Sequence, residues 1–290
     1  MSAAPFCVII PAHNEESVIE RCLQAIYAGA PANARPEVIV SANGCHDRTV
    51  AIARAVAPDA IVLDLPKGSK TGAINAANQA ASHFPRIILD ADCECSYSSL
   101  AALAAALREP GVMTAAPAIQ MELSRCSALM KAYYRAWLRQ PYAKAGKGGA
   151  GCYGLSEDAL AKIGQFPPII GDDIWIHTRF PDEAMRYIAE DSNGQPVFSV
   201  VRPPRTVQEQ IRIEARRQSG NAEVGQIYPS QHFVNTNQRG GWSKALRSGA
   251  APSDLAVFFA IKLASRVFAR WNRVRGKASV WARDNSARAT

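Results

Sequence analysis

The chain has 290 residues, of which 48% are hydrophobic and 20% are charged. This composition is ordinary for a globular protein with a sizeable buried core, and it excludes a disordered or fibrous chain. No apolar run approaches the ~20 residues of a membrane-spanning helix, and the short apolar start lacks the basic flank of a secretory signal. The seven cysteines show no zinc-binding spacing, which predicts free thiols. A cytoplasmic protein is therefore expected.

The formal net charge of +8 is unevenly distributed along the chain. Residues 1–243 carry 23 basic and 23 acidic side chains, whereas residues 244–290 carry ten basic and two acidic ones. A neutral body with a basic tail indicates that the tail meets an anionic surface, and it argues against a nucleic acid partner.

The first half of the chain predicts strands that alternate with helices. The expected strands are 6–10, 37–40, 60–63 and 86–89, and the expected helices between them are 14–28, 48–56 and 71–83. Such alternation favours right-handed crossovers and a mainly parallel sheet. Ligands bind beyond the carboxyl ends of the strands in such sheets. Polar residues follow every predicted strand, so a site is expected at this edge.

The second half predicts helices over residues 123–139, 208–220 and 254–273, and a linker over 235–253. In the last helix, basic residues spaced by four, four and three positions share one face: Lys262, Arg266, Arg270 and Arg273. Its apolar residues are Leu255, Phe258, Phe259, Leu263, Val267 and Trp271. This pattern is typical of a helix in a membrane interface. The alternative is a helix that packs its apolar stripe on the body and solvates its arginines.

Two acidic motifs could carry chemistry. Asp90 and Asp92 end a predicted strand, and carboxylates so placed can hold a divalent cation while leaving room for phosphate; an acidic turn is the alternative. Glu94 adds a third carboxylate, either close to the ion or solvated. Asp172 and Asp173 open a predicted helix, where a carboxylate beside a cleft could accept a proton or simply cap the helix.

Basic residues at two places could meet phosphate. Lys70 stands at a predicted helix start, where a phosphate contact is plausible. Arg216 and Arg217 lie on a basic helix, and guanidinium groups suit phosphate oxygens; a solvated face is the alternative.

Taken in order, the motifs resemble those of family 2 glycosyltransferases with the GT-A fold, over about residues 5–220. They are Val8-Ile-Ile-Pro-Ala-His-Asn-Glu-Glu16, Val38-Ile-Val with Asn43-Gly-x-x-Asp47-x-Thr49, Lys70-x-x-Ala73-x-Asn75, Asp90-Ala-Asp92, Asp172-Asp173 and the segment 212–220. The resemblance implies a Rossmann-type, mixed but mainly parallel α/β sheet flanked by helices, followed by a C-terminal amphipathic helical tail. It also implies a GT-A domain over 1–230 (a nucleotide-sugar half to about 115 and an acceptor half over 116–230) and a tail over 231–290.

The resemblance also assigns roles to residues. Asp92 would hold Mg²⁺ or Mn²⁺ on the diphosphate of the donor, and Asp173 would be the general base of an inverting transfer. Asp90 would lie close to the ribose or the metal. The nucleotide-sugar site would further include Pro11, Asn14, Glu15, Asn43 and Asp47, with Lys70 and Arg216 or Arg217 on the diphosphate. A UDP-sugar is the expected donor.

Three departures from the family pattern qualify these roles. Ala42-Asn43 stands where the family usually has an acidic pair, so uridine is only the commonest choice of base. Asp172 replaces the usual glutamate, and the Arg216-Arg217-Gln segment lacks the tryptophan of processive members, which favours a single addition.

The expected acceptor is a saccharide or a lipid-linked sugar, with residues 254–277 on an anionic membrane surface at its cytoplasmic face. A nucleotidyltransferase and a non-catalytic nucleotide-sugar-binding or membrane-surface protein are the alternatives.

Overall fold

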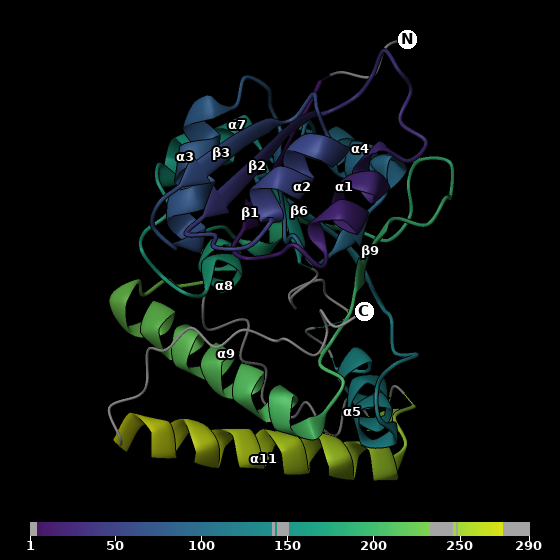
Figure 1. Ribbon diagram of the computed structural model, residues 1–290. Helices are drawn as coiled ribbons and strands as arrows, with labels where there is room; N and C mark the ends of the chain where they lie inside the picture. The colour runs from purple at the N-terminus through teal and green to yellow at the C-terminus, as the bar shows by residue number, and fades with distance from the viewer. Residues whose placement is uncertain (1–4, 141–142, 144–150, 233–245, 248, 275–290) are drawn as a thin grey trace. The chain divides into compact units, whose positions relative to one another are not determined.

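The computed structural model describes residues 5–140, 143, 151–232, 246–247 and 249–274 (Figure 1). Two compact units make up the chain. The first comprises Met1–Gln120, Gly149–Asp173 and Arg179–Val201, and the second comprises Met121–Gly148, Ile174–Thr178 and Arg202–Thr290.

The first unit is built on a mixed sheet, in which nine strands are found among the described residues. They are β1 (Cys7–Ala12), β2 (Glu37–Asn43), β3 (Ile61–Leu65), β4 (Arg86–Leu89), β5 (Glu94–Cys95), β6 (Thr114–Met121), β7 (Cys152–Leu155), β8 (Met185–Ile188) and β9 (Phe198–Val201). The order is β3-β2-β1-β4-β7-β6-β9-β5, with β8 beside β6. Strands β1 to β4 pair in parallel, whereas β7 is antiparallel to both β4 and β6. The predicted fold class is confirmed.

The helices of the first unit cover both faces of this sheet. They are α1 (Ile19–Tyr27), α2 (Thr49–Val56), α3 (Lys70–Ala80), α4 (Tyr97–Ala106), α7 (Glu157–Ile163), the 3-10 turn η1 (Asp182–Ala184) and the start of α8 (Asp172–His177). In β1, Val8 and Ile10 share a buried cluster with Ile19 of α1, while Ile9 belongs to a second cluster with Ala77 of α3. Cover on both faces explains why β1 is apolar at successive positions instead of alternating.

The first helix begins later than its sequence pattern predicts. A helix from residue 14 is expected, but α1 begins at Ile19. Asn14 has a φ of +53°, a left-handed conformation that cannot continue a right-handed helix and that asparagine tolerates better than most residues. Its backbone N–H donates to Cys45 Sγ at 3.2 Å, so a contact from the next loop decides the conformation of this segment.

The second unit contains three long helices among its described residues: α5 (Ala128–Leu138), α9 (Val207–Ile227) and α11 (Pro252–Val274). Helix α5 begins five residues later than expected because Ser127 caps it, its side chain accepting a hydrogen bond from Met130 N–H. Helix α9 continues seven residues beyond its expected end at Gly220, which is buried within it. Helix α11 packs against both α9 and α5 (Figure 1).

Polar and aromatic contacts hold α11 on its two neighbours. Asp254 accepts two hydrogen bonds from the Arg135 guanidinium of α5, at 2.7 and 2.8 Å. Lys262 pairs with the buried Glu214 of α9, and the ring of Phe258 stacks on that of Tyr133 at 5.2 Å. Of the four basic residues expected on one face of this helix, Lys262 is held by its ion pair with Glu214.

The apolar residues of α11 also divide between two faces. Leu255, Phe258 and Ile261 are buried. Phe259, Leu263, Val267 and Trp271 are exposed. The helix thus packs on the body and still presents apolar side chains to solvent. None of the described helices is long and apolar enough to cross a membrane.

Candidate active site

The loops that follow β1 and β2 are joined through the side chain of Asn43, the last residue of β2. Its amide nitrogen donates to Ala12 O at 2.8 Å, and its amide oxygen accepts from Ser69 N–H at 2.9 Å. The carbonyl oxygen of Asn43 also contacts His13 Nδ1. Because this buried side chain is bonded at both ends, it positions three loops at the edge of the sheet; a direct contact with a nucleoside stays a prediction.

A second set of hydrogen bonds shapes the surface of the same edge. Asn14 Oδ1 accepts from His46 N–H at 2.7 Å, and Asp47 accepts from the N–H groups of Glu16 and Thr49 at 3.1 and 3.0 Å. The hydroxyl of Thr49 in turn accepts from Glu15 N–H at 2.6 Å. These contacts bring Asn14, Glu15 and Asp47 together, and their contact with a nucleoside stays a prediction.

Gly44 explains how closely two of these loops approach. It has a φ of +57°, and a Cβ at this position would come within 2.7 Å of the Gly68 backbone nitrogen. Only glycine is free of both problems, so this residue lets the loop after β2 lie against the loop before α3. Pro11, by contrast, lies within the buried strand β1.

The acidic turn after β4 lies at the other side of the β1 tip. Asp90 N–H donates to Gly151 O at 2.7 Å, and Asp90 O accepts from Cys93 N–H at 3.0 Å, which closes a tight turn. Asp92 lies half-buried within this turn. Because the chain adds β2 and β3 on one side of β1 and β4 on the other, this is the position where open α/β sheets bind ligands.

Lys70 joins this turn to the second acidic motif. Its ammonium nitrogen lies 2.7 Å from Asp90 Oδ1 and 3.1 Å from Asp172 Oδ1. The helix that carries it begins at Lys70 because Ser69 caps it, accepting from Gly72 N–H at 3.1 Å. Two motifs that are far apart in the sequence therefore meet at one cation.

Tyr153 of β7 completes this cluster. Its hydroxyl donates to Asp172 Oδ2 at 2.9 Å, and the side chain of Asp172 is 3% exposed. Each oxygen of the buried carboxylate thus has a donor, as burial of a charged group requires. Asp173 follows Asp172 at the start of α8 and is half-buried.

The cluster is electrostatically coupled. Burial raises the pKa of the Asp90 carboxyl to about 6; the Lys70 ammonium opposes this rise, and the carboxylates of Asp92 and Asp172 add to it. Burial acts to lower the pKa of Lys70, but the carboxylates of Asp172 and Asp90 raise it above its usual range. Burial and the charge of Asp172 also raise the pKa of the Tyr153 hydroxyl. Lys70 is therefore a permanent cation and Tyr153 a permanent hydrogen-bond donor.

Asn75 holds the segment that leads to Asp172 against α3. Its amide nitrogen donates to Phe166 O at 2.8 Å, and its amide oxygen accepts from Phe166 N–H at 2.8 Å. This reciprocal pair of bonds satisfies one whole peptide position in a loop. It positions the chain only a few residues before the acidic pair.

The donor set fits a divalent cation that is shared with a ligand. No group of three or more His, Cys, Asp or Glu side chains forms a metal cage within the described residues. Mg²⁺ and Mn²⁺ sites of phosphate-binding enzymes use one or two carboxylates together with phosphate oxygens and water. Asp92 and the neighbouring Asp90 provide two such carboxylates in the turn after β4.

Two other predicted groups lie elsewhere. Glu94, the third carboxylate of the acidic motif at Asp90 and Asp92, forms an ion pair with Arg21 of α1 at 3.3 Å. Arg216 and Arg217 belong to α9 of the second unit, and Arg217 lies 3.9 Å from Glu214. Their contact with a diphosphate stays a prediction.

Sequence reasoning missed Tyr153 and the positioning role of Asn75. A tyrosine in a short apolar strand carries no local signal, because its partner Asp172 lies in a distant segment. Asn75 was part of a recognised motif, but its bonds to Phe166 exist only in the folded chain. His13 is likewise placed in the site by its contact with Asn43.

The chain matches the model of glycosyl transferase family 2 over residues 7–153, which is just over half of its length. It therefore belongs to this family, and this finding decides against the nucleotidyltransferase alternative. The matched region contains β1 to β6 and the start of β7, with Lys70, Asp90 and Asp92, whereas the acidic pair at Asp172 lies beyond it.

Solved structures show the same fold. A mannosyltransferase from Pyrobaculum calidifontis, in complex with GDP-Man and Mn²⁺, is 17% identical with a TM-score of 0.59, covering 92% of this chain and 87% of its own. Glucosyl-3-phosphoglycerate synthase from Mycobacterium tuberculosis, in complex with Mn²⁺, UDP and glucosyl-3-phosphoglycerate, is 19% identical with a TM-score of 0.54, covering 77% and 79%. A comparison with curated proteins gives no match.

Proposed function

We propose that this protein transfers a sugar from a nucleotide diphosphate donor to an acceptor hydroxyl, with inversion at the anomeric carbon. A UDP-sugar is the first choice of donor. The observation that carries the proposal is the double ion pair of Lys70 with Asp90 and Asp172. It brings the acidic turn after β4 and the acidic pair of α8 to one place at the ligand-binding edge of the sheet.

In this mechanism the residues of the chain divide into two groups. Asp92 would hold the divalent cation, with Asp90 beside it, and Lys70 and Arg216 or Arg217 would contact the diphosphate. The nucleoside occupies the edge formed by Pro11, Asn14, Glu15, Asn43 and Asp47. A bound Mg²⁺ or Mn²⁺ supplies charge neutralisation for the departing nucleoside diphosphate. Both solved structures named above are complexes with Mn²⁺, which supports this cofactor.

Asp173 acts as the general base. Its carboxylate takes the proton of the acceptor hydroxyl while that oxygen attacks the anomeric carbon, and the bond to the diphosphate oxygen breaks with its electron pair on the leaving group. Such proton transfer contributes roughly 10²- to 10⁴-fold to the rate. Asp172 is held by Lys70 and Tyr153, so the neighbouring Asp173 starts from a fixed backbone position, which favours in-line attack.

We further propose that the acceptor is a saccharide or a lipid-linked sugar at the cytoplasmic face of a membrane. The basic tail contacts the anionic surface of this membrane through residues 254–277. The exposed apolar side chains of α11 support this, because they lie beside basic residues as in helices that rest in a membrane interface. The seven free cysteines are in keeping with a reducing compartment.

Calorimetric titration with UDP, GDP, dTDP and CDP, each with Mn²⁺ or with a chelator, tests the donor site. We expect one nucleotide to bind in a metal-dependent way and Asp92→Ala to abolish that binding. Asp64→Asn is the control, because it removes one exposed carboxylate from β3 of the same unit. Absence of nucleotide binding under every condition would contradict the proposal.

Turnover of the identified donor then tests the base. Asp173→Asn is expected to bind the nucleotide about as tightly as the native protein and to lose at least ~100-fold in donor cleavage. If Asp173→Asn cleaved the donor at the native rate, another group would have to accept the proton.

A further inference from the structure

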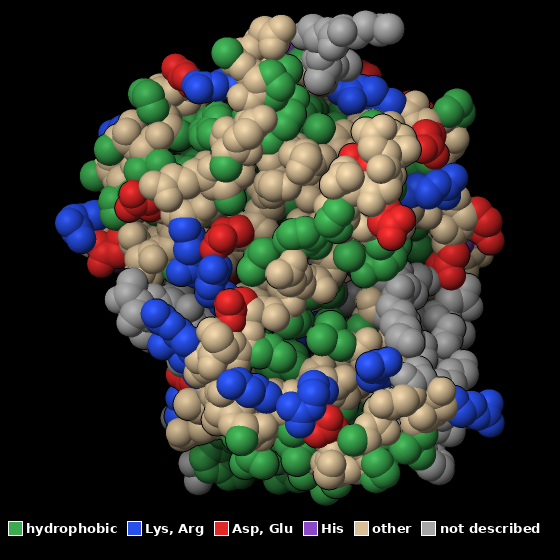
Figure 2. Space-filling view, turned by 90° about the vertical axis from the view of Figure 1, so that its right-hand side faces the viewer, with side chains coloured by type: hydrophobic (Ala, Val, Ile, Leu, Met, Phe, Trp, Pro, Cys, Tyr) green, Lys and Arg blue, Asp and Glu red, His purple; other side chains and the backbone are tan. Residues whose placement is uncertain are grey.

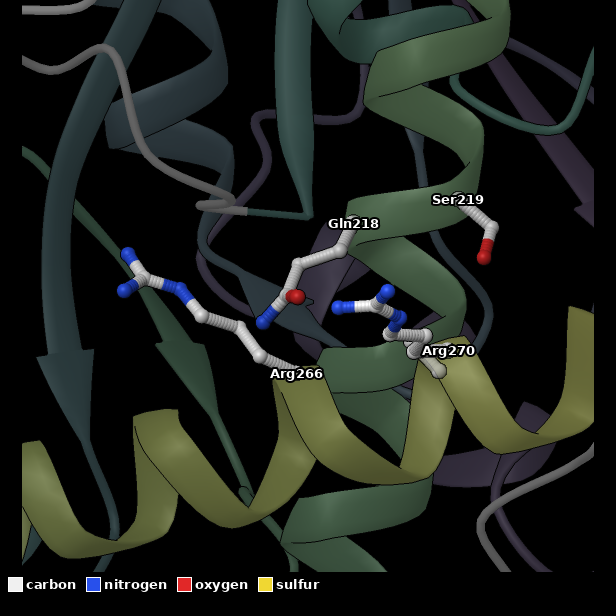
Figure 3. Close-up of a pocket in the computed structure, with 5 residues that line it drawn as sticks. Gln218, Ser219, Arg266 and Arg270 are labelled. Atoms are coloured by element: carbon white, nitrogen blue, oxygen red, sulfur yellow. The ribbon is translucent and has the colours of Figure 1, made fainter.

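A cavity of about 500 Å³ opens between α9 and α11 of the second unit. Its lining residues are Gln218, Ser219, Arg266, Ala269 and Arg270. Figure 3 shows Arg266 and Arg270 projecting from α11, with the side chain of Gln218 reaching from α9 into the space between them. Gln218 donates to Ser265 Oγ at 2.9 Å, a bond that holds the two helices together beside the cavity.

The cavity carries positive charge that the surrounding residues leave uncompensated. Arg266 and Arg270 are both exposed, and neither forms an ion pair with a carboxylate of the described residues. Glu214 of α9 is engaged elsewhere, because it pairs with Lys262 and accepts a hydrogen bond from Tyr133. Two guanidinium groups that line one cavity favour the binding of a phosphate group, because its oxygens can accept hydrogen bonds from their N–H groups.

An exposed apolar stripe lies next to this cavity. It consists of Phe259, Leu263, Val267, Trp271 and Val274, which are 44%, 63%, 62%, 47% and 83% exposed. At 100° per residue, Arg266 and Arg270 lie within about 60° of Leu263 around the helix axis, so the stripe and the arginines share one side of α11. Figure 2 shows hydrophobic side chains along the lower edge of the molecule, at the height of α11 in Figure 1.

We propose that the cavity binds the phosphate of an anionic phospholipid while the apolar stripe enters the acyl region beside it. This inference deepens the proposed membrane contact by naming the lipid chemistry and its site, and it is independent of the transfer reaction. A soluble phosphate would use the two arginines but would leave the stripe in water. A lipid satisfies both, because its phosphate and its acyl chains are adjacent at the depth where interfacial helices lie.

Co-sedimentation with vesicles tests the proposal on the full chain. Vesicles of phosphatidylcholine with about 30% phosphatidylglycerol provide anionic phosphates, and vesicles of phosphatidylcholine alone provide the neutral comparison. We expect binding to the anionic vesicles alone. The double variant Arg266→Gln with Arg270→Gln should weaken that binding about 30-fold, from roughly a fivefold contribution of each arginine near an anionic surface.

Two further variants separate the site from general charge and from free phosphate. Arg54→Gln with Lys162→Gln removes two exposed charges from the first unit and should retain native binding. Leu263→Gln with Val267→Gln removes apolar side chains from the stripe and should abolish binding. All these positions are exposed, so the variants should unfold at the native temperature, which a thermal scan checks.

Three results would overturn the proposal. One is the absence of binding to either kind of vesicle by the native protein. Another is an equal loss in the Arg54/Lys162 control, which would show a diffuse charge effect. The third is displacement by inorganic phosphate together with unchanged binding of the Leu263/Val267 variant, which would indicate a free phosphate ligand. Nucleotide binding in the absence of vesicles is measured in parallel, so failure of the lipid site and failure of the donor site are distinguishable.

Discussion

Replacement of Tyr153 by phenylalanine removes one donor from a buried carboxylate and little else. The hydroxyl donates to Asp172 Oδ2 at 2.9 Å, and the Asp172 side chain is 3% exposed. Since water cannot readily replace the lost donor, the full cost of an unsatisfied charged group is expected. Hydrogen bonds to charged groups contribute about 1.5–3 kcal/mol. We therefore expect the free energy of unfolding to fall by about 2 kcal/mol in Tyr153→Phe.

Thermal unfolding is the first assay. In a chain of this size, 1 kcal/mol corresponds to a shift in Tm of about 2–4 °C, so Tyr153→Phe should unfold about 4–8 °C lower. Tyr27→Phe is the matched control, because the Tyr27 ring is half-buried and stacks under Arg35, while its hydroxyl has no hydrogen bond among the described residues. We expect its Tm to remain near the native value.

A double-mutant cycle identifies the partner. Asp172→Asn removes the charge, so adding Tyr153→Phe to this variant should cost clearly less than it does in the native protein. A coupling free energy of about 1 kcal/mol or more is expected for residues in direct contact. If Tyr153→Phe shifted Tm no more than Tyr27→Phe, or if the two substitutions were additive, the assignment of this bond as a stabilising contact of the acidic cluster would be refuted.

Three further predictions concern other parts of the chain. Gly151→Ala should lower the free energy of unfolding by about 2–4 kcal/mol, because Gly151 has a φ of +60° and a Cβ there would lie 2.2 Å from Cys93 Sγ. Gly194 has a φ of +73° and open space around its Cβ position, so Gly194→Ala should lower the free energy of unfolding by only about 1 kcal/mol. Urea titrations measure both losses, and equal losses would contradict this explanation. Hydrogen bonding to Arg135 lowers the pKa of Asp254, so Asp254→Asn should lower the free energy of unfolding by about 0.5–1 kcal/mol at pH 7. The difference in free energy of unfolding between the native protein and this variant should decrease as the pH falls below about 4, where the carboxyl of the unfolded chain becomes protonated. Cys45 is partly exposed whereas the other six cysteines are buried, so N-ethylmaleimide should modify it first, and the nucleotide with Mn²⁺ should slow that reaction; modification at an unchanged rate would place the nucleotide elsewhere.

The four strands β1 to β4 of the first unit could be predicted because each is determined by a local pattern. The predicted strand at 86–89 coincides with β4, and the predicted position of Asp90 directly after it is confirmed. Alternation of apolar strands with amphipathic helices implies crossovers on both faces of a sheet, and the carboxyl ends of parallel strands necessarily share one edge. The edge that carries the acidic turn could therefore be derived from the sequence, whereas the family was indicated by the resemblance of the motifs.

Helix boundaries and the faces of α11 could not be derived in the same way. The conformation of Asn14 depends on a contact with Cys45 in another loop, and such a contact has no local sequence signal. Apolar residues occur around much of α11, so periodicity alone does not decide which of them pack. The ion pair of Lys262 with Glu214 and the packing of Phe258 on Tyr133 select one face.

The fold class, the resemblance to the family and the positions of both acidic motifs could be recognised in the amino-acid sequence, because they depend on the order of local patterns along the chain. The contacts of Lys70 with Asp90 and Asp172, and the hydrogen bond from Tyr153 to Asp172, became visible in the folded chain. A buried charge requires partners, and those partners come from whichever distant segments the sheet brings to the same edge.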